Sequence, residues 1–379
     1  MDRQSRSDVT RQRLAALSAA DLTPLVQRAL NIPGTALNGW RFAPLQAGSG
    51  GGTFTTITYR FDGEAHAQGK TLAWSLILKV LYSVDGQSMT DSRYWKREAH
   101  AYQSGWLAQL AGSLVAPRCL GVVEHPEACW LWLEHVADAS PARWTLEHYE
   151  LVARHLGGFS GAYLADNALP DWPWLSVQWI RHDHARFGAW VARHAALPQH
   201  PLIQRLLPDG SLAAILDLWA ERERFLAVLE RLPQTLCHLD AFRHNLLIRS
   251  DPAQTVAVDW AFGGIGPVGV ELVALLWVGL VFDELPTLPL PELDQRIFEH
   301  YAGGLRSAGW QGDLRLARLG YTAAIGLRRV SSIGVALSMF EQGLLTEGDI
   351  PMLDRIALSG TFIDGLTEEA RMLMNSLGI

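Results

Sequence analysis

Three side chains that lie close together in the sequence could carry out phosphoryl transfer. The chain reads CHLDAFRHNLLI over residues 237–248, and a second apolar run ends in Asp259. Asp240 could accept the proton of an attacking hydroxyl group, because this reaction needs a carboxylate beside that hydroxyl. Asn245 and Asp259 offer the oxygen atoms that magnesium prefers, so they could hold this ion against the phosphates of a nucleotide.

The segments between these residues predict how they meet. Two short apolar segments flank a turn at residues 250–252, which predicts a hairpin. The hairpin would bring Asn245 and Asp259 together, and the loop before it would hold Asp240 several ångströms away, where a substrate hydroxyl could sit. The pattern H-x-D-x-x-x-x-N is weak alone, because short patterns match many chains by chance, and a surface loop with a buried histidine would also explain it.

Further residues upstream stand in the order that a kinase-type nucleotide site requires. A glycine-rich turn (AGSGGGT, residues 47–53) separates two segments of strand character, Lys79 interrupts an apolar strand candidate, and Glu98 follows on a helical segment. Each feature also has a simpler explanation, namely a flexible hairpin loop, an edge-strand lysine whose charge reaches water, and a solvated helix face. The ordered set, rather than any single residue, favours a nucleotide site.

With these motifs the sequence resembles the aminoglycoside phosphotransferase and choline kinase family, relatives of the protein kinases, over roughly residues 20–340. The resemblance implies that Asp240 is the catalytic aspartate and that His238 supports the catalytic loop. It also implies that Asn245 and Asp259 bind Mg²⁺.

The same resemblance implies a nucleotide site in the first part of the chain. Lys79 would contact the α- and β-phosphates of the nucleotide and pair with Glu98. The backbone from Glu134 to Val136 would form the hinge that holds adenine. The loop over the phosphates would contain Gly48, Ser49, Gly50 and Gly51.

Three positions depart from the family pattern. Leu239 stands where the family usually has glycine, Trp260-Ala261 replaces Phe-Gly, and Glu271 occupies a position that is often aspartate. These departures remove no named catalytic group, but they leave the subfamily, and therefore the substrate, open.

The elements expected around these residues divide the chain into two lobes. We predict an α+β, protein-kinase-like fold in which residues 1–135 form an antiparallel sheet with one internal helix, and residues 136–379 form a larger, mainly helical lobe. Ser18 and Asp21 predict a capping box at the start of an N-terminal helix. The strand candidates are 40–45, 54–61, 72–82 and two strands within 119–135, with a polar turn at 62–70 and a β-rich segment at 235–260. The helical candidates are 91–112, 145–165, 174–195, 211–231, 268–282, 291–308, 313–341 and 351–376.

Composition excludes several classes of protein. The 379 residues are 49% hydrophobic and 19% charged, so the chain can bury a large core, and its net charge of −7 argues against nucleic acid as the main partner. Three cysteines cannot make a disulfide framework. No secretory signal is visible, and the longest apolar run, 272–282, is shorter than the roughly 20 residues of a membrane span. We therefore expect a cytoplasmic protein without a membrane segment.

Two other motifs suggest different chemistry. Gly264, Gly266 and Gly269 fit G-x-G-x-x-G, and Asp283 follows near the spacing of a ribose-binding acid, as in an NAD site. No alternating strand–helix pattern follows, so a glycine-rich turn before a helix explains them better. The run at 182–184 (HDH) has metal-binding residue types but poor spacing, so solvated helix histidines are favoured.

The sequence leaves the phosphate acceptor open among aminoglycosides, amino alcohols and sugars. Most of the tryptophans gathered at 172–190 suggest packing, although one or two could form an aromatic wall against a sugar or amine. Glu271, Asp283 and Glu284 could bind a polycationic substrate or simply face water. The favoured interpretation is a kinase that uses ATP (or GTP) and Mg²⁺ to phosphorylate a small-molecule hydroxyl. The alternative is a nucleotide-binding pseudokinase with a regulatory role.

Overall fold

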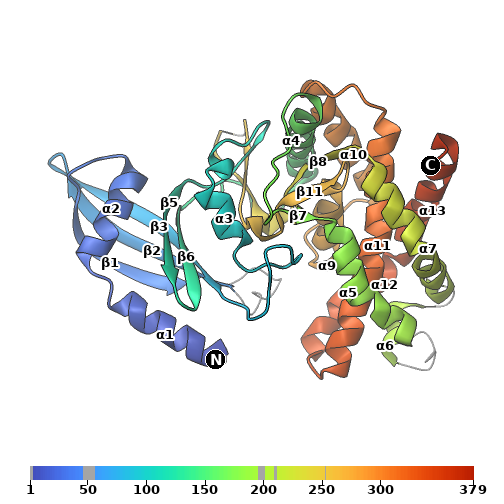
Figure 1. The fold of residues 1–379 in the computed structure, drawn as a ribbon, viewed down its shortest axis with the longest axis horizontal. Helices are drawn as coiled ribbons and strands as arrows, with labels where there is room; N and C mark the ends of the chain where they lie inside the picture. Colours follow the sequence, from blue (N-terminus) through green and yellow to red (C-terminus); the bar gives the residue numbers. More distant parts are fainter. Residues whose placement is uncertain (1–2, 46–55, 195–200, 209–210, 252) are drawn as a thin grey trace.

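The computed structural model of the chain describes residues 3–45, 56–194, 201–208, 211–251 and 253–379. Within them the chain forms a sheet-rich N-terminal lobe beside a larger, mainly helical C-terminal lobe (Figure 1). The predicted two-lobed α+β fold is therefore confirmed. The exact division at residues 135 and 136 stays a proposal, placed directly after the last strand of the large sheet.

The N-terminal lobe is built on a five-stranded antiparallel sheet with the strand order β1-β2-β3-β6-β5. Helix α2 (Ala19–Leu30) follows α1 (Arg3–Ala15) and packs on one face of this sheet through Leu22 and Val26. The predicted capping box is present, because the backbone N–H of Ser18 donates to the Asp21 carboxylate at 2.8 Å. The strands are β1 (Ala36–Pro44), β2 (Thr56–Ala67), β3 (Lys70–Tyr82), β5 (Cys119–His125) and β6 (Ala128–Glu134).

The hairpin between β2 and β3 is longer than predicted. Residues 62–67 continue β2 instead of forming a polar turn, and the turn is confined to Gln68 and Gly69, both with positive φ. Small residues at the inward positions weakened the apolar alternation in this part of the sequence. Gly63 is one of them, and a Cβ there would lie 2.5 Å from the ring of Trp74.

The helix that carries Glu98 is much shorter than the predicted 91–112. Helix α3 spans Arg97–Gln103, and Gly105 ends the segment with a φ of +76°. The fully buried Arg97, at the start of the helix, donates from its guanidinium group to the backbone carbonyls of Asp91 and Ser92. These bonds hold residues 91–96 in turns that lead back toward the C-terminal lobe.

The C-terminal lobe is organised around α11 (Leu314–Glu341), which packs against α5, α7 and α13 (Figure 1). By length and composition α11 could cross a membrane, but 67% of its apolar window is buried inside the fold, as in the core helix of a soluble protein. The other helices are α4 (Leu146–Ala165), α5 (Trp179–His194), α6 (Pro201–Leu206), α7 (Ser211–Arg231), α8 (Glu271–Val273), α9 (Gly279–Val281), α10 (Leu290–Ser307), α12 (Ile350–Leu358) and α13 (Gly360–Leu377).

Three predicted helices differ in their bounds. The helix expected from residue 174 begins at Trp179, because Ser176–Val177 form the short strand β7. The helix expected at 268–282 begins at Glu271 and contains a wider π-helical turn at Ala274–Val278. The helix expected at 351–376 is interrupted at Ser359, next to a glycine that lets the backbone approach the buried Arg329.

Two small sheets support the candidate catalytic segments. Strands β9 (Leu246–Ile248) and β10 (Thr255–Ala257) form the predicted hairpin, and β10 also pairs in parallel with β4 (Leu114–Val115). Strand β11 (Gly264–Pro267) pairs antiparallel with β8 (Gln234–Cys237) and in parallel with β7.

The G-x-G-x-x-G motif serves packing in this arrangement. A Cβ on Gly264 would lie 1.9 Å from the carbonyl oxygen of Ser176, and Gly269 has a φ of +93° against helix α11. The motif therefore has no strand–helix unit of the dinucleotide type around it.

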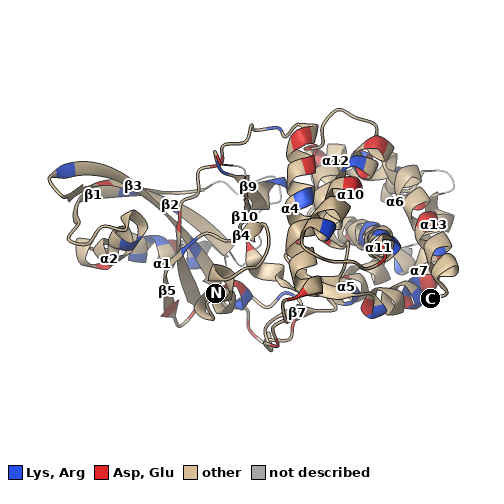
Figure 2. Ribbon diagram, turned by 90° about the horizontal axis from the view of Figure 1, so that it is seen from above, with Lys and Arg blue, Asp and Glu red and all other residues tan. Residues whose placement is uncertain are grey.

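Positive and negative side chains are interspersed over the helices of the C-terminal lobe (Figure 2). This distribution agrees with the modest net charge of the chain. The expected absence of a nucleic-acid partner and the cytoplasmic location stay predictions.

Candidate active site

Lys79 links two carboxylates in the cleft between the lobes. Its Nζ lies 2.5 Å from Glu98 Oε2 on α3 and 2.7 Å from Asp259 Oδ1 after β10. The Glu98 side chain is almost fully buried, and its Oε1 accepts the backbone N–H of Trp260 at 3.3 Å. Strand, helix and hairpin are thus joined at one buried ammonium group, as the sequence predicted for Lys79 and Glu98.

Ion pairs keep the ammonium group of Lys79 charged although it is buried. Burial alone would lower the pKa of Lys79, but the carboxylates of Asp259 and Glu98 outweigh it, and the pKa is raised. Burial would raise the pKa of Asp259, yet the neighbouring ammonium group holds it below the usual value for aspartate. Lys79 is therefore a cation and Asp259 an anion across the neutral pH range.

His238 and Asn245 both form hydrogen bonds to Asp240 in the loop between β8 and β9. The side-chain amide Nδ2 of Asn245 donates to both the backbone oxygen and Oδ2 of Asp240, each at 3.0 Å. The backbone oxygen of Asn245 accepts the N–H of Val258 at 2.8 Å, which brings Asn245 next to the segment that ends in Asp259. The hairpin therefore gathers Asp240, Asn245 and Asp259 as the sequence predicted.

His238 acts on the backbone of this loop. Its Nε2 lies 2.9 Å from the Val258 carbonyl, and the Asp240 N–H donates to its Nδ1. Burial lowers the pKa of His238 to about 4, so the ring is neutral and Nε2–H is the donor. The ring contacts backbone groups, and we assign His238 a positioning role.

Glu271 explains how Leu239 can stand where the family usually has glycine. Leu239 has a φ of +65°, a left-handed conformation that costs about 1–2 kcal/mol for a residue with a Cβ. The fully buried Glu271 accepts the N–H groups of His238 and Leu239 with its two carboxylate oxygens. The departures at 239 and 271 therefore act together, and Glu271 is unavailable to a substrate.

We expect Glu271→Gln to lower the stability of the protein by about 1–3 kcal/mol, because its amide nitrogen would face a backbone donor in a buried place. Thermal unfolding of the purified protein measures this change. The exposed Glu347 provides a control, since Glu347→Gln should leave the unfolding temperature unchanged. Equal unfolding temperatures for the two variants would contradict the role given to Glu271.

Trp260, the second departure, fills the space behind the hairpin. Its ring is fully buried and contacts His238 and Trp106, with ring centroids 4.6 and 5.5 Å away. Its Nε1 donates to the Ala257 carbonyl at 2.8 Å, so the only hydrogen-bond donor of the indole ring has a partner.

Trp172 and Trp174 stack on each other, with ring centroids 5.1 Å apart, beside Trp106. This arrangement supports the packing role expected for most tryptophans at 172–190.

The remaining predicted nucleotide contacts are placed only in part. The chain leaves the sheet after Glu134, whose side chain pairs with Arg118 and Arg249. In the described residues no hydrogen bond uses the Val136 backbone, which leaves its N–H and carbonyl available to an adenine ring. The loop with Gly48, Ser49, Gly50 and Gly51 lies outside the described residues.

Asn245 and Asp259 have the oxygen donors that a magnesium ion requires. The amide nitrogen of Asn245 is committed to Asp240, so its side-chain oxygen is the atom that can face an ion. Asp259 is anionic, and 42% of its side chain is exposed. Magnesium is commonly held by one or two protein groups together with nucleotide phosphates, so these residues fit it.

The acidic residues suggested for a polycationic substrate are engaged elsewhere. Glu284 Oε1 lies 2.6 Å from His244 Nε2, and the exposed Asp283 faces Arg143 at 3.9 Å.

The HDH run at residues 182–184 forms no metal site in the described part of the chain, which contains no cluster of three or more His, Cys, Asp or Glu around a possible ion. His182 is solvated as expected, whereas His184 is buried against Trp219.

A cluster of charged residues beside Asp240 was not predicted from the sequence. The buried Asp183 on α5 binds Arg93 Nη2 at 3.0 Å and Arg328 Nη1 at 2.8 Å. Arg97 also crosses between the lobes, donating to the carbonyls of Trp174 and Ala261. These partners lie far apart in the chain, so no local motif marks them.

Comparison with known proteins identifies the class. The model of the phosphotransferase enzyme family, APH, matches residues 68–311, more than half of the chain, and the protein therefore belongs to this family. The predicted family is confirmed. Comparison with curated protein sequences found no match.

Two solved structures share the fold at low sequence identity. The amicoumacin kinase hAmiN, solved with AMP-PNP, Ca²⁺ and Ami, superposes with a TM-score of 0.55 at 14% identity, covering 86% of this chain and 88% of that one. An ethanolamine kinase from Plasmodium vivax superposes with a TM-score of 0.50 at 12% identity, covering 86% and 83% of the two chains. Family and fold together support a small-molecule phosphotransferase.

Proposed function

We propose that the protein transfers the γ-phosphoryl group of ATP to a hydroxyl group of a small molecule with the help of Mg²⁺. One observation carries this proposal, namely that a buried Lys79–Glu98 pair and Asp259 meet beside a loop on which Asn245 fixes the Asp240 carboxylate. This arrangement combines a cation for nucleotide phosphates, oxygen ligands for a divalent ion and a base for a hydroxyl.

The proposed reaction assigns a role to each of these residues. Lys79 holds the α- and β-phosphates, Glu98 keeps its ammonium group in place, and Asn245 and Asp259 would hold Mg²⁺. When bound, this ion neutralises negative charge on the phosphates. GTP would fit the same phosphate contacts, and the hinge backbone from Glu134 to Val136 would decide between the two bases.

Asp240 receives the proton in this mechanism. The acceptor oxygen forms a bond to the γ-phosphorus, and the bond from that phosphorus to the bridging oxygen breaks, so that ADP leaves. The hydroxyl proton moves to the Asp240 carboxylate. Asn245 fixes Oδ2 of this carboxylate, so the aspartate meets the hydroxyl in a single orientation.

The rate should depend on the protonation of Asp240. Burial and the nearby charge of Asp259 raise the pKa of Asp240 to about 7 in the protein without ligands. Because a base must be deprotonated, we expect kcat/KM to fall as the pH decreases through the pKa of this group, and the bound cation should shift the inflection downward. A profile of kcat/KM between about pH 5 and 9 measures this, and a rate that falls as the pH rises through this range would contradict the role of Asp240.

A pooled acceptor screen tests the proposed function. The protein is incubated with Mg-ATP and a mixture of aminoglycosides, amino alcohols, sugars and hydroxy acids, with Asp240→Ala as the control, and products are detected by mass spectrometry. A phosphorylated compound formed only by the unchanged protein is the expected result. Magnesium-dependent nucleotide binding without any product would favour the pseudokinase alternative, and an absence of nucleotide binding would contradict the proposal.

A further inference from the structure

We infer that the hydroxyl acceptor carries an anionic group and an apolar carbon skeleton, and that Arg328 recognises the anion. This inference rests on the proposed function and names the substrate class for the same site. It differs from the polycationic acceptor that the sequence left open.

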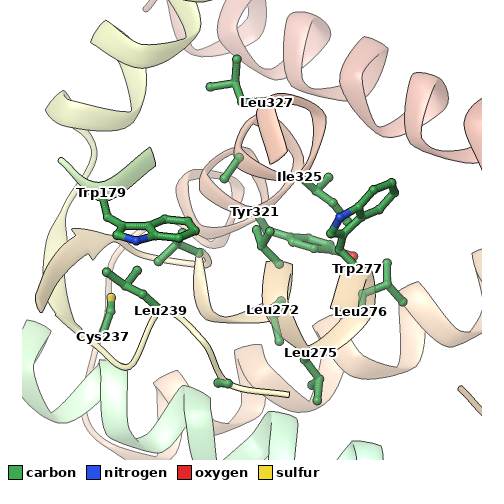
Figure 3. Packing of buried hydrophobic residues seen from close by; sticks show 14 of the residues in the cluster. Trp179, Cys237, Leu239, Leu272, Leu275, Leu276, Trp277, Tyr321, Ile325 and Leu327 are labelled. Carbon is green, nitrogen blue, oxygen red and sulfur yellow. The ribbon is translucent and has the colours of Figure 1, made fainter. Parts of the chain in front are cut away.

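The hollow beside Asp240 has a lining that suits an acceptor. It is an open depression of about 410 Å³, solvent-filled space included, between Asp240 and Leu239, residues 270–278, Trp179 on α5 and Arg328 on α11. Figure 3 shows Trp179 lying beside Leu239 within this part of the core. The part formed by residues 270–278 presents Val273, Ala274 and Val278, so most of the surface is apolar. An acceptor placed here would bury a carbon skeleton next to the proposed base.

The wall formed by residues 270–278 contains an irregularity of the kind found at binding sites. Ala274–Val278 form a π-helical turn between the two short helices α8 and α9. Such wide turns are rare and occur frequently at functional sites. Ala274 and Val278 of this turn line the hollow together with Arg328, which is consistent with a wall shaped for a ligand.

The side of the hollow that contains Asp183 and Arg328 carries unequal numbers of positive and negative groups. Asp183, only 4% exposed, lies between Arg93 and Arg328, so two guanidinium groups share one carboxylate. In the described part of the chain Asp183 is the only carboxylate within salt-bridge distance of either arginine. These three residues therefore carry one surplus positive charge, which faces the hollow that Asp240 also lines, and the side chain of Arg328 is 24% exposed.

Arg328 is held in a geometry suited to an anion. Its guanidinium lies 4.9 Å from the ring centroid of Trp179, and its Nη1 is fixed by Asp183, while Nε and Nη2 have no partner among the described residues. A planar guanidinium with spare N–H donors binds carboxylates and phosphates in pairs of hydrogen bonds. Arg328 and the proposed base Asp240 line the same hollow, so an anion bound by Arg328 would lie in the space next to the base.

A cationic acceptor would be poorly matched to this pocket. An ammonium group would lose its hydration among apolar side chains and face the surplus positive charge of the cluster. Of the other carboxylates in this region, Glu271 is buried under the loop and Glu284 is paired with His244, which leaves Asp240, the proposed base, as the one that lines the hollow without an ion pair among the described residues. An anionic group instead gains hydrogen bonds from Arg328.

Matched ligands test this inference by binding, independently of turnover. The probes are mandelate, its uncharged amide mandelamide, and 2-amino-1-phenylethanol, which share a benzylic hydroxyl and a phenyl ring. Calorimetry with the Asp240→Asn protein saturated with Mg-AMP-PNP should give a Kd for mandelate at least about 10-fold lower than for the amide or the amine. The phosphate monoester of 1-phenyl-1,2-ethanediol at its primary oxygen forms a further arm, and tighter binding than mandelate would identify a phosphate rather than a carboxylate as the anion.

Variants of Arg328 assign the effect to this residue. Adding Arg328→Gln should raise the Kd of the preferred anion about 10- to 100-fold and leave the Kd of mandelamide unchanged, whereas Arg328→Lys should retain part of the preference. Arg222 provides the matched control, because it stacks on Trp219 at 4.3 Å but does not line the pocket.

Two outcomes would overturn the inference. One is tighter or equal binding of the amine or amide compared with both anions. The other is an anion preference that persists in Arg328→Gln. The proposed function fails separately, when the unchanged protein binds no Mg-nucleotide or phosphorylates none of the pooled acceptors.

Discussion

Replacing Asp240 by asparagine should reduce phosphoryl transfer by about 10²- to 10⁴-fold while the protein still folds and binds Mg-nucleotide. Asparagine has nearly the same shape as aspartate, but it cannot take a proton from the acceptor hydroxyl. Asp240 lies beside Asn245 without an ion pair of its own, so its loss should leave the Lys79 network intact. Steady-state assays with the acceptor found in the screen measure kcat, and calorimetry measures nucleotide affinity.

An exposed carboxylate near the same cleft provides the control for this variant. Asp283 follows α9, and among the described residues the one ion pair of its side chain is with Arg143, at 3.9 Å, so Asp283→Asn should retain kcat within about 2-fold. A kcat of the Asp240→Asn protein close to that of the unchanged enzyme would show that another group accepts the proton. A loss of nucleotide binding in Asp240→Asn would show instead that the loop itself had changed.

Replacing Lys79 by methionine should affect both stability and activity. The substitution leaves the carboxylate of Glu98, which is 1% exposed, without its cation, and breaking a buried ion pair in this way costs about 3–5 kcal/mol. It also removes the cation proposed to hold the nucleotide phosphates, so we expect kcat to fall at least 100-fold. Chemical unfolding and kinetic assays measure the two effects separately.

A double variant separates the structural role of Lys79 from its catalytic role. In Lys79→Met with Glu98→Gln no uncompensated negative charge is buried at position 98, and the glutamine oxygen can still accept the N–H of Trp260. We expect this protein to recover most of the lost stability and none of the activity. Recovery of activity together with stability would mean that Lys79 only supports the fold and does not contact the nucleotide.

The catalytic segment was predictable because its geometry is local. Asp240, Asn245 and Asp259 lie within 20 residues of one another, and the two apolar segments between them define a hairpin that brings them together. Lys79 and Glu98 were also predictable, since a charge within an apolar strand must find a partner and the next helix offers one. The same reasoning gave the two-lobed fold, because helical and strand periodicities occupy different parts of the chain.

Features that depend on distant contacts could not be predicted in this way. The short helix α3 results from Arg97, whose side chain bonds to backbone carbonyls in both lobes. In the cluster of Arg93, Asp183 and Arg328 the two ion pairs join residues 90 and 145 positions apart, and no local pattern distinguishes any of the three in the sequence. The compensation of Leu239 by Glu271 likewise requires the fold, because only there do its oxygens reach the strained loop.

Transfer of an isotope label tests the central claim most directly. ATP labelled with ¹⁸O at the non-bridging oxygens of the γ-phosphoryl group is supplied with magnesium and the acceptor, and the product is weighed by mass spectrometry. The account predicts that the product carries the whole label, keeps the acceptor oxygen unlabelled and forms at a greatly reduced rate with Asp240→Asn. A product without the label, or one formed equally fast by Asp240→Asn, would contradict it.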